Sequence, residues 1–167
     1  MSFLASAIMR GIPGAFIANS GIGKLSADEE TSAGLQQFAA TGIPAVKKLP
    51  KDQFAKILGG AEVALGGALL SPFVSNKLAG TALTAFGAGL LSMYFRNDNM
   101  TLSDGIRPSE EGLALSKDSW LVALGAGLIA MDASEDISKF GAKRKLKKAE
   151  KKQRKAEKKL TKFKDED

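Results

Sequence analysis

Glu62 is the side chain whose position in the sequence calls for a chemical explanation. It lies near the middle of the apolar segment 54–74, FAKILGGAEVALGGALLSPFV. About 20 mostly apolar residues in a helix cross the roughly 30 Å hydrocarbon core of a bilayer. A carboxylate at that depth costs about 3 kcal/mol on insertion scales, so we expect it to face the interior of a helix bundle and to have a partner there. Counting helical rise along the first apolar segment places Asn19 and Ser20 within reach of Glu62.

Two roles for Glu62 follow from this position. In the structural role, the carboxyl group is hydrogen-bonded to Asn19, locks the first two membrane helices together and is neutral at pH 7, because desolvation disfavours the charged form. In the functional role, it is a carboxylate that faces a proton or a quinone. Arg10 with Asp132 or Glu135 forms a second predicted polar pair, since all three are expected near the cytoplasmic face.

The absence of cysteine and histidine limits the chemistry of this chain. Its 167 residues contain neither type, which excludes disulfides, iron–sulfur ligation by thiolates, histidine ligation of haem or zinc, and a catalytic triad. We therefore predict no catalytic residue, no metal ligand and no resident cofactor.

Charge is segregated along the chain. Residues 142–167 contain 13 Lys and Arg against 5 Asp and Glu, whereas the whole chain carries a net charge of only +6. The basic character therefore belongs to the tail, and the rest is a nearly neutral unit rich in Gly, Ala and Leu. This asymmetry is typical of a membrane body with a charged appendage.

Four apolar segments predict four membrane-crossing helices, at about 4–24, 54–72, 78–95 and 116–133. A short amphipathic helix, capped by Ser26 with Glu29 three residues later, is predicted between the first two. The expected fold is an all-α integral membrane four-helix bundle (residues 1–141) followed by a basic cytoplasmic helical tail (142–167). Small residues at a spacing of four predict the surfaces where helices approach closely: Gly60, Ala64, Ala68, Ala85 and Gly89.

The tail is a predicted helix with several alternative roles. From residue 143 to residue 163 it lacks Gly and Pro, and apolar or uncharged residues recur at spacings of three and four in a weak heptad pattern: Leu146, Ala149, Gln153, Ala156, Leu160 and Phe163. The helix could be merely solvated, could bind anionic headgroups, or could dock on an acidic protein surface. Nucleic acid is not favoured, because no pattern of interleaved aromatic and basic residues is present. The residues expected to dock are Lys143, Arg144, Lys147, Lys148, Lys151, Lys152, Arg154 and Lys155.

Four short stretches carry a family resemblance. They are residues 18–25 (ANSGIGKL), 38–44 (FAATGIP), 58–62 (LGGAE) and 116–121 (SKDSWL). With them, residues 4–133 resemble the DoxX family of small four-span bacterial membrane proteins, in its actinobacterial form. The resemblance implies a four-helix bundle in the bacterial plasma membrane and a loose association with respiratory or redox machinery, but no defined reaction.

The leading hypothesis is a non-catalytic small membrane protein, an accessory or assembly subunit of a larger plasma-membrane complex such as a respiratory oxidase. The alternative is a DoxX-type redox-linked component that binds quinone or a lipid-like substrate near Glu62. A soluble helical domain is a third hypothesis. Four spans place both termini on one side of the membrane, and the basic tail favours the cytoplasm for that side.

Overall fold

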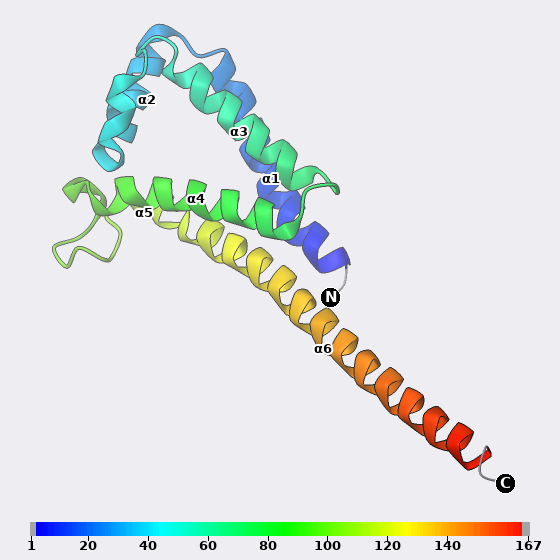
Figure 1. Cartoon of the computed structure of the whole chain (residues 1–167). Coiled ribbons are helices and arrows are strands. Elements are labelled where there is room, and N and C mark those ends of the chain that lie inside the picture. The colour runs from blue at the N-terminus through cyan, green and yellow to red at the C-terminus, as the bar shows by residue number, and fades with distance from the viewer. Residues whose placement is uncertain (1–2, 165–167) are drawn as a thin grey trace. The chain divides into compact units, whose positions relative to one another are not determined.

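The computed structural model describes the backbone of residues 3–164, and side chains at residues 4–134, 137, 140, 142–151 and 153. All long elements in this part of the chain are helical, as the sequence predicted (Figure 1). They are α1 (Phe3–Leu25), α2 (Glu29–Gly42), the 3-10 helix η1 (Pro44–Lys48), α3 (Phe54–Leu70), α4 (Asn76–Phe95), the 3-10 helix η2 (Asp98–Met100), α5 (Leu113–Ser116) and α6 (Ser119–Lys164).

The chain divides into two compact units, Met1–Met131 and Asp132–Asp167. The first unit ends at Met131, whereas the predicted domain boundary lay after residue 141. The second unit is formed by the continuation of α6.

Two helical stretches are long and apolar enough to cross a membrane, α4 and the stretch Leu113–Ser134, which contains α5 and the start of α6. Both correspond to predicted spans. The other two predicted spans coincide with α1 and α3. At 17 residues, α3 is about 25 Å long, and α1 contains Arg10 and Lys24.

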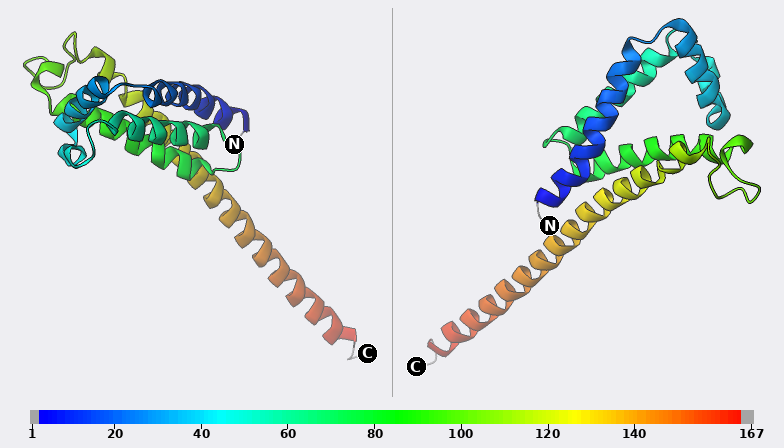
Figure 2. Two further views of the ribbon diagram at one scale, coloured as in Figure 1. Left: turned by 90° about the horizontal axis from the view of Figure 1, so that it is seen from above. Right: turned by 180° about the vertical axis from the view of Figure 1, so that it is seen from behind.

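Glycines bring α1 and α3 together as antiparallel neighbours, side by side in Figures 1 and 2. A Cβ atom at Gly21 would lie 2.6 Å from the Gly59 carbonyl oxygen, and one at Gly66 would lie 2.6 Å from the Gly14 carbonyl oxygen. No side chain fits at such distances, so each position requires glycine. The contact face of α3 is a repeat of buried residues at spacings of three and four: Ala55, Gly59, Glu62, Gly66 and Leu69.

The predicted packing row on α3 is therefore wrong by one residue. Gly60 and Ala64 are exposed and Ala68 is only half-buried, and a Cβ at Gly60 would meet nothing within 4 Å. Small residues occur on both sides of this helix, so their spacing alone did not show which side faces α1.

A similar glycine contact joins α4 to the start of α6. A Cβ at Gly80 would lie 2.5 Å from the Gly125 carbonyl oxygen and 2.9 Å from the Leu128 Cβ. Ala85, which was predicted to pack here, is exposed, and Gly89 is half-buried with only Ile43 near it, at 3.5 Å from a built Cβ. The apolar core of the unit is centred on Ile17, Leu69, Ala79, Leu83 and Leu128.

Helix α2 is held by polar contacts at its buried face. Its N-cap is Asp28, not the predicted Ser26: the Asp28 carboxylate accepts a hydrogen bond of 2.8 Å from the Thr31 amide. Hydrogen bonds from the Thr31 hydroxyl and amide lower the pKa of Asp28. The cap therefore keeps its charge to a lower pH than a free carboxyl would.

Further along α2, two buried side chains tie it to the segment that precedes α3. The Ser32 hydroxyl donates to the Lys51 carbonyl at 2.6 Å and accepts from the Ala55 amide at 2.9 Å. The Gln36 amide nitrogen donates to the carbonyl oxygens of Val46 and Leu49. These bonds fix the start of α3, and they hold Gln36 in the interior of the unit.

Candidate functional site

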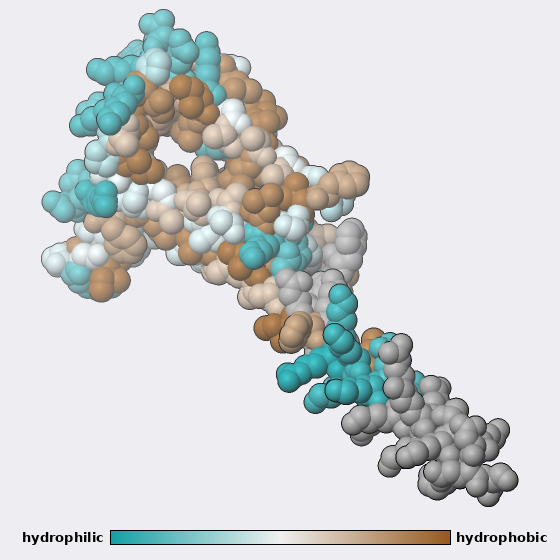
Figure 3. All heavy atoms as spheres, in the orientation of Figure 1, coloured by the Kyte–Doolittle hydropathy of each residue, from teal (hydrophilic) through white to brown (hydrophobic). Residues whose placement is uncertain are grey.

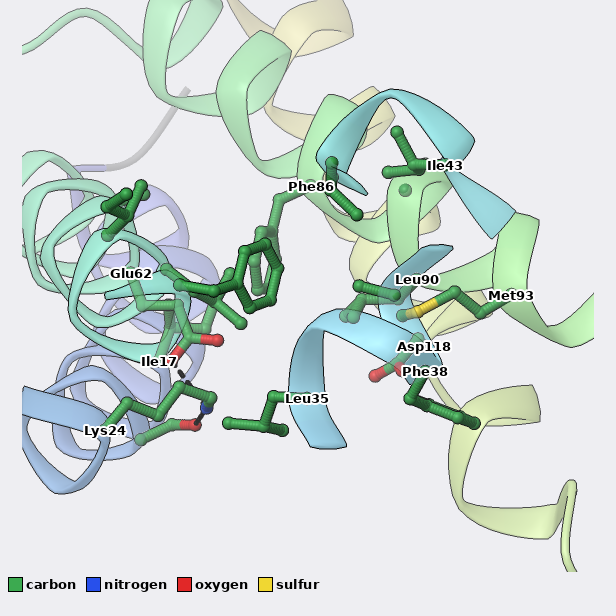
Figure 4. A pocket seen from close by; sticks show the side chains of 18 of the residues that line it. Ile17, Lys24, Leu35, Phe38, Ile43, Glu62, Phe86, Leu90, Met93 and Asp118 are labelled. Atoms are coloured by element: carbon green, nitrogen blue, oxygen red, sulfur yellow. Dashed lines mark hydrogen bonds and ion pairs between the residues drawn. The ribbon is translucent and has the colours of Figure 1, made fainter. Parts of the chain in front are cut away.

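A cavity of about 560 Å³ lies within the first unit. Its walls come from α1, α2, η1, α3, α4, α5 and the start of α6. Figure 4 shows side chains from α1, α2, α3 and α4 around a common space. The lining is mainly aliphatic and aromatic and includes Phe16, Ile17, Leu35, Phe38, Ile57, Phe86, Leu90 and Met93. The polar side chains on its wall are Ser20, Lys24, Glu62 and Asp118.

Lys24 and Glu62 form an ion pair on the cavity wall. The Lys24 Nζ lies 2.8 Å from Glu62 Oε2 and 2.7 Å from the Ser20 Oγ (Figure 4). The Glu62 side chain is 6% exposed and that of Lys24 is 21% exposed. The pair therefore links α1 to α3 where both charges are largely removed from solvent, and their mutual attraction compensates for the lost hydration.

The Lys24 side chain reaches Glu62 because of helix geometry. In an α-helix the Cα–Cβ bonds tilt toward the N-terminus, so a lysine at the end of α1 extends back along the helix by about one turn. This brings its ammonium group to the level of Ser20. Gly21 on α1 and Gly59 on α3 face each other and allow the two backbones to approach closely enough for the charged groups to meet.

The predicted partner of Glu62 is thus corrected from Asn19 to Lys24. Asn19 is exposed, and the described hydrogen bond to Glu62 comes from Lys24. Ser20 does belong to the site, through Lys24. From the sequence alone, Lys24 was predicted only to end the first membrane span. The spacing of Ser20 and Lys24, one turn apart, was the available signal.

The four stretches that resemble the DoxX family all contribute residues to this cavity. Lys24 belongs to the first stretch and Phe38 to the second, while Glu62 and Asp118 belong to the third and fourth. Asp118 lies directly before α6 and is half-buried. Segments that are up to about 100 positions apart in the sequence therefore converge on one space.

Arg10 forms a separate buried polar site at the other end of α3. Its guanidinium donates to three carbonyl oxygens at the C-terminal end of that helix, those of Ala68, Leu69 and Ser71. It also donates to the Val74 carbonyl and the Asn76 side chain. These contacts use all five of its N–H groups. The positive charge thus lies at the negative end of the α3 dipole.

The predicted pairing of Arg10 with Asp132 or Glu135 stays a prediction. Asp132 belongs to the second unit, and the side chain of Glu135 lies outside the described residues. The sequence signal that could have predicted the partners of Arg10 is the end of α3 and the connection 71–75, because carbonyl groups at the end of a helix need hydrogen-bond donors from elsewhere.

The predicted docking residues lie in the second unit. Those with described side chains are all exposed: Lys143, Arg144, Lys147, Lys148 and Lys151. Figure 3 shows hydrophilic side chains along this part of the helix. The side chains of Lys152, Arg154 and Lys155 lie outside the described residues.

Among the residues described, no group of three or more acidic side chains is placed to hold a metal ion. Comparison with family models, curated proteins and solved structures finds no match for this chain.

Proposed function

We propose that this chain is a multi-pass protein of the bacterial plasma membrane, of DoxX type, in which α1, α3, α4 and the start of α6 cross the bilayer. Its role is to bind a quinone or another lipid-like molecule in the cavity beside Glu62. Both termini lie in the cytoplasm. This proposal goes beyond the two membrane-length helical stretches that the structure contains.

The charges of α1 and α3 are compatible with a membrane. Arg10 and Glu62 are buried and Lys24 is mostly covered, each with partners inside the protein. The remaining charge, Lys56, is exposed in the first turn of α3, where its side chain can extend toward the membrane surface. In contrast, Leu4, Ile8, Ile12 and Phe16 are exposed at regular spacings of four along α1. A continuous exposed apolar stripe is unfavourable in water and suits contact with lipid tails.

The observation that carries the ligand proposal is the chemistry of the cavity wall. The wall is mainly apolar, as a lipid-like chain requires. Its polar groups on α1 and α3 are joined through Lys24, whose ammonium group contacts both the Ser20 hydroxyl and the Glu62 carboxylate. An ammonium group has three N–H donors, and the described contacts use two of them. The third is available to the carbonyl oxygen of a ligand headgroup. An apolar pocket with a small number of well-placed polar groups is typical of small-molecule sites.

The chain's own residues would bind and orient this ligand. Lys24 and Ser20 would hold the headgroup, and Phe38 and Phe86 would cover the chain. A quinone would supply any redox chemistry itself, because the protein contains no thiol or imidazole group. All four DoxX-like stretches contribute residues to the wall of this cavity.

Filling the cavity tests the proposal. Ala85 lines the cavity and Ala88, on the same helix, does not, yet both are exposed. The full-length wild type and the A85F and A88F variants are purified from their native membrane in gentle detergent, and bound lipophilic molecules are extracted and quantified by mass spectrometry. We expect about one molecule per chain in the wild type and A88F, and a clear loss in A85F. Equal content in A85F and A88F would overturn the proposal.

An accessory role in a larger complex is the second candidate, because the exposed basic residues 143–151 offer a docking surface. Deleting residues 142–167 tests it. Loss of co-purifying cytochrome subunits, with unchanged bound ligand, would show that the tail recruits a complex independently of the cavity. If no subunits accompany the full-length protein, this second role is excluded.

A further inference from the structure

The tail sequence arranges its apolar and charged residues in heptads. Helix α6 continues through residue 164, so the heptad positions of the tail can be assigned from the sequence. With Leu146 at position a, the a positions are 146, 153 and 160 and the d positions are 149, 156 and 163. Leu146 is 64% exposed, and Ala149 and Gln153 are also exposed.

In the middle of the tail, the charges that flank this seam have opposite signs on its two sides. Position g is Lys at residues 145, 152 and 159, and position e is Glu at residues 150 and 157 but Lys at residues 143 and 164. The other basic residues of the tail fall at b, c and f, on the outer side of the helix. In a parallel pair of helices, each g residue faces the e residue five positions later on the partner.

We propose that the C-terminal helix pairs with a second copy of this chain in a parallel two-stranded coiled coil. In that arrangement Lys145 faces Glu150 of the other copy, and the positions 152 and 157 repeat this match one heptad later. The next such pair, at positions 159 and 164, is Lys with Lys, so the match is confined to the first two heptads. The antiparallel arrangement would place g opposite g and e opposite e, so that Lys meets Lys and Glu meets Glu. Charge complementarity therefore selects the parallel dimer.

The residues of the seam are compatible with this dimer. Leu at a and small Ala at d allow two helices to approach closely, and Gln153 at a central a position can hydrogen-bond to its symmetry mate, as a polar a residue does when it fixes register. The outer b, c and f lysines point away from the partner, which limits their repulsion, and physiological salt screens them over about 8 Å.

Cysteine cross-linking in the native membrane tests the proposal, since the chain contains no cysteine. The full-length A149C variant carries its thiol at d, facing the partner, and the K151C variant carries it at f, on the outer side. Under mild oxidation we expect most of the A149C protein to become a covalent dimer, while K151C stays monomeric. Equal cross-linking of the two variants, or none in either, would overturn the proposal.

Charge reversal gives the second arm of the experiment. In the A149C background, E150K places Lys opposite Lys145 and should abolish cross-linking, and adding K145E to E150K should restore it. These exposed positions leave the first unit unchanged. Cross-linking that is insensitive to E150K would contradict the proposal. So would cross-linking that increases with E150K and requires anionic phosphatidylglycerol, because that is the behaviour of a basic helix bound to headgroups.

Discussion

Lys24 and Glu62 are not equivalent members of their ion pair. Glu62 is 6% exposed and Lys24 is 21% exposed. A long lysine side chain that loses its partner can turn its ammonium group toward water, whereas the carboxylate on α3 has no such path. Removing Lys24 therefore leaves a buried charge without compensation, which is the costly way to break a buried pair.

We expect K24M to lower the free energy of unfolding by about 3 kcal/mol. E62Q should lower it by only about 1 kcal/mol, because the amide keeps the shape and still accepts from Lys24. Thermal and denaturant unfolding of the purified full-length variants in detergent measures both. Equal losses of unfolding free energy in the two variants would show that Lys24 does not stabilise the buried charge of Glu62.

Arg10 holds the C-terminal end of α3 through five hydrogen bonds. A lysine offers three donors from one point and cannot reproduce this fork. We expect R10K to lower the free energy of unfolding by about 3 kcal/mol and to speed amide exchange in residues 68–76, measured by hydrogen exchange. R96K is the matched control, because the described contact of Arg96 is a single bond to the Gly42 carbonyl, and it should have little effect.

At the scale of elements, the sequence predicted which long segments are helical, but not which faces they use. It also missed that the fourth predicted span and the tail belong to one helix, α6. Apolar residues occur on every side of α3, so the spacing of its hydrophobic residues does not show which side is buried. Gly59 and Gly60 are adjacent, and Gly66 and Gly67 likewise, which makes two faces look equally suited to packing. Which one faces α1 depends on tertiary register, as do the partners of Glu62 and Arg10.

These glycine pairs make a sharp test of the α1–α3 interface. A Cβ at Gly59 or Gly66 would collide with backbone atoms of α1, while one at Gly60 or Gly67 would meet nothing within 4 Å. We expect G59A and G66A to lower the melting temperature. G60A and G67A should raise it slightly, because alanine favours a helix over glycine by about 1 kcal/mol. The account fails if all four alanine variants shift the temperature in the same direction.

At the scale of the whole molecule, composition predicted a basic tail on a nearly neutral helical body, and the structure divides the chain close to that point. The cavity could not be predicted, because it requires seven elements, α1, α2, η1, α3, α4, α5 and α6, to be placed around one space. The sequence did supply its components: each of the four stretches compared with the DoxX family borders it.

The proposed topology predicts a pattern of accessibility in intact cells. Four crossings place residues 26–53 and 97–115 outside and the connection 71–75 inside. With single cysteines in the full-length chain, a membrane-impermeant maleimide should label K51C and S103C and leave F73C unlabelled until the cells are opened. Phe73 is 95% exposed, so its protection would come from the membrane alone. Labelling of all three sites in intact cells would contradict four crossings.

The central claim is that a lipid-like molecule lies beside Lys24 and Glu62. The most direct measurement uses photoreactive analogues of a quinone and of a phospholipid, each incubated with the wild-type protein in membranes and mapped by peptide mass spectrometry. We expect one of them to label residues 16–24, 58–62 and 85–93, and its unlabelled parent to compete with this labelling. If both label only the exposed residues Leu4, Ile12 and Phe73, as surrounding lipid would, the claim is contradicted.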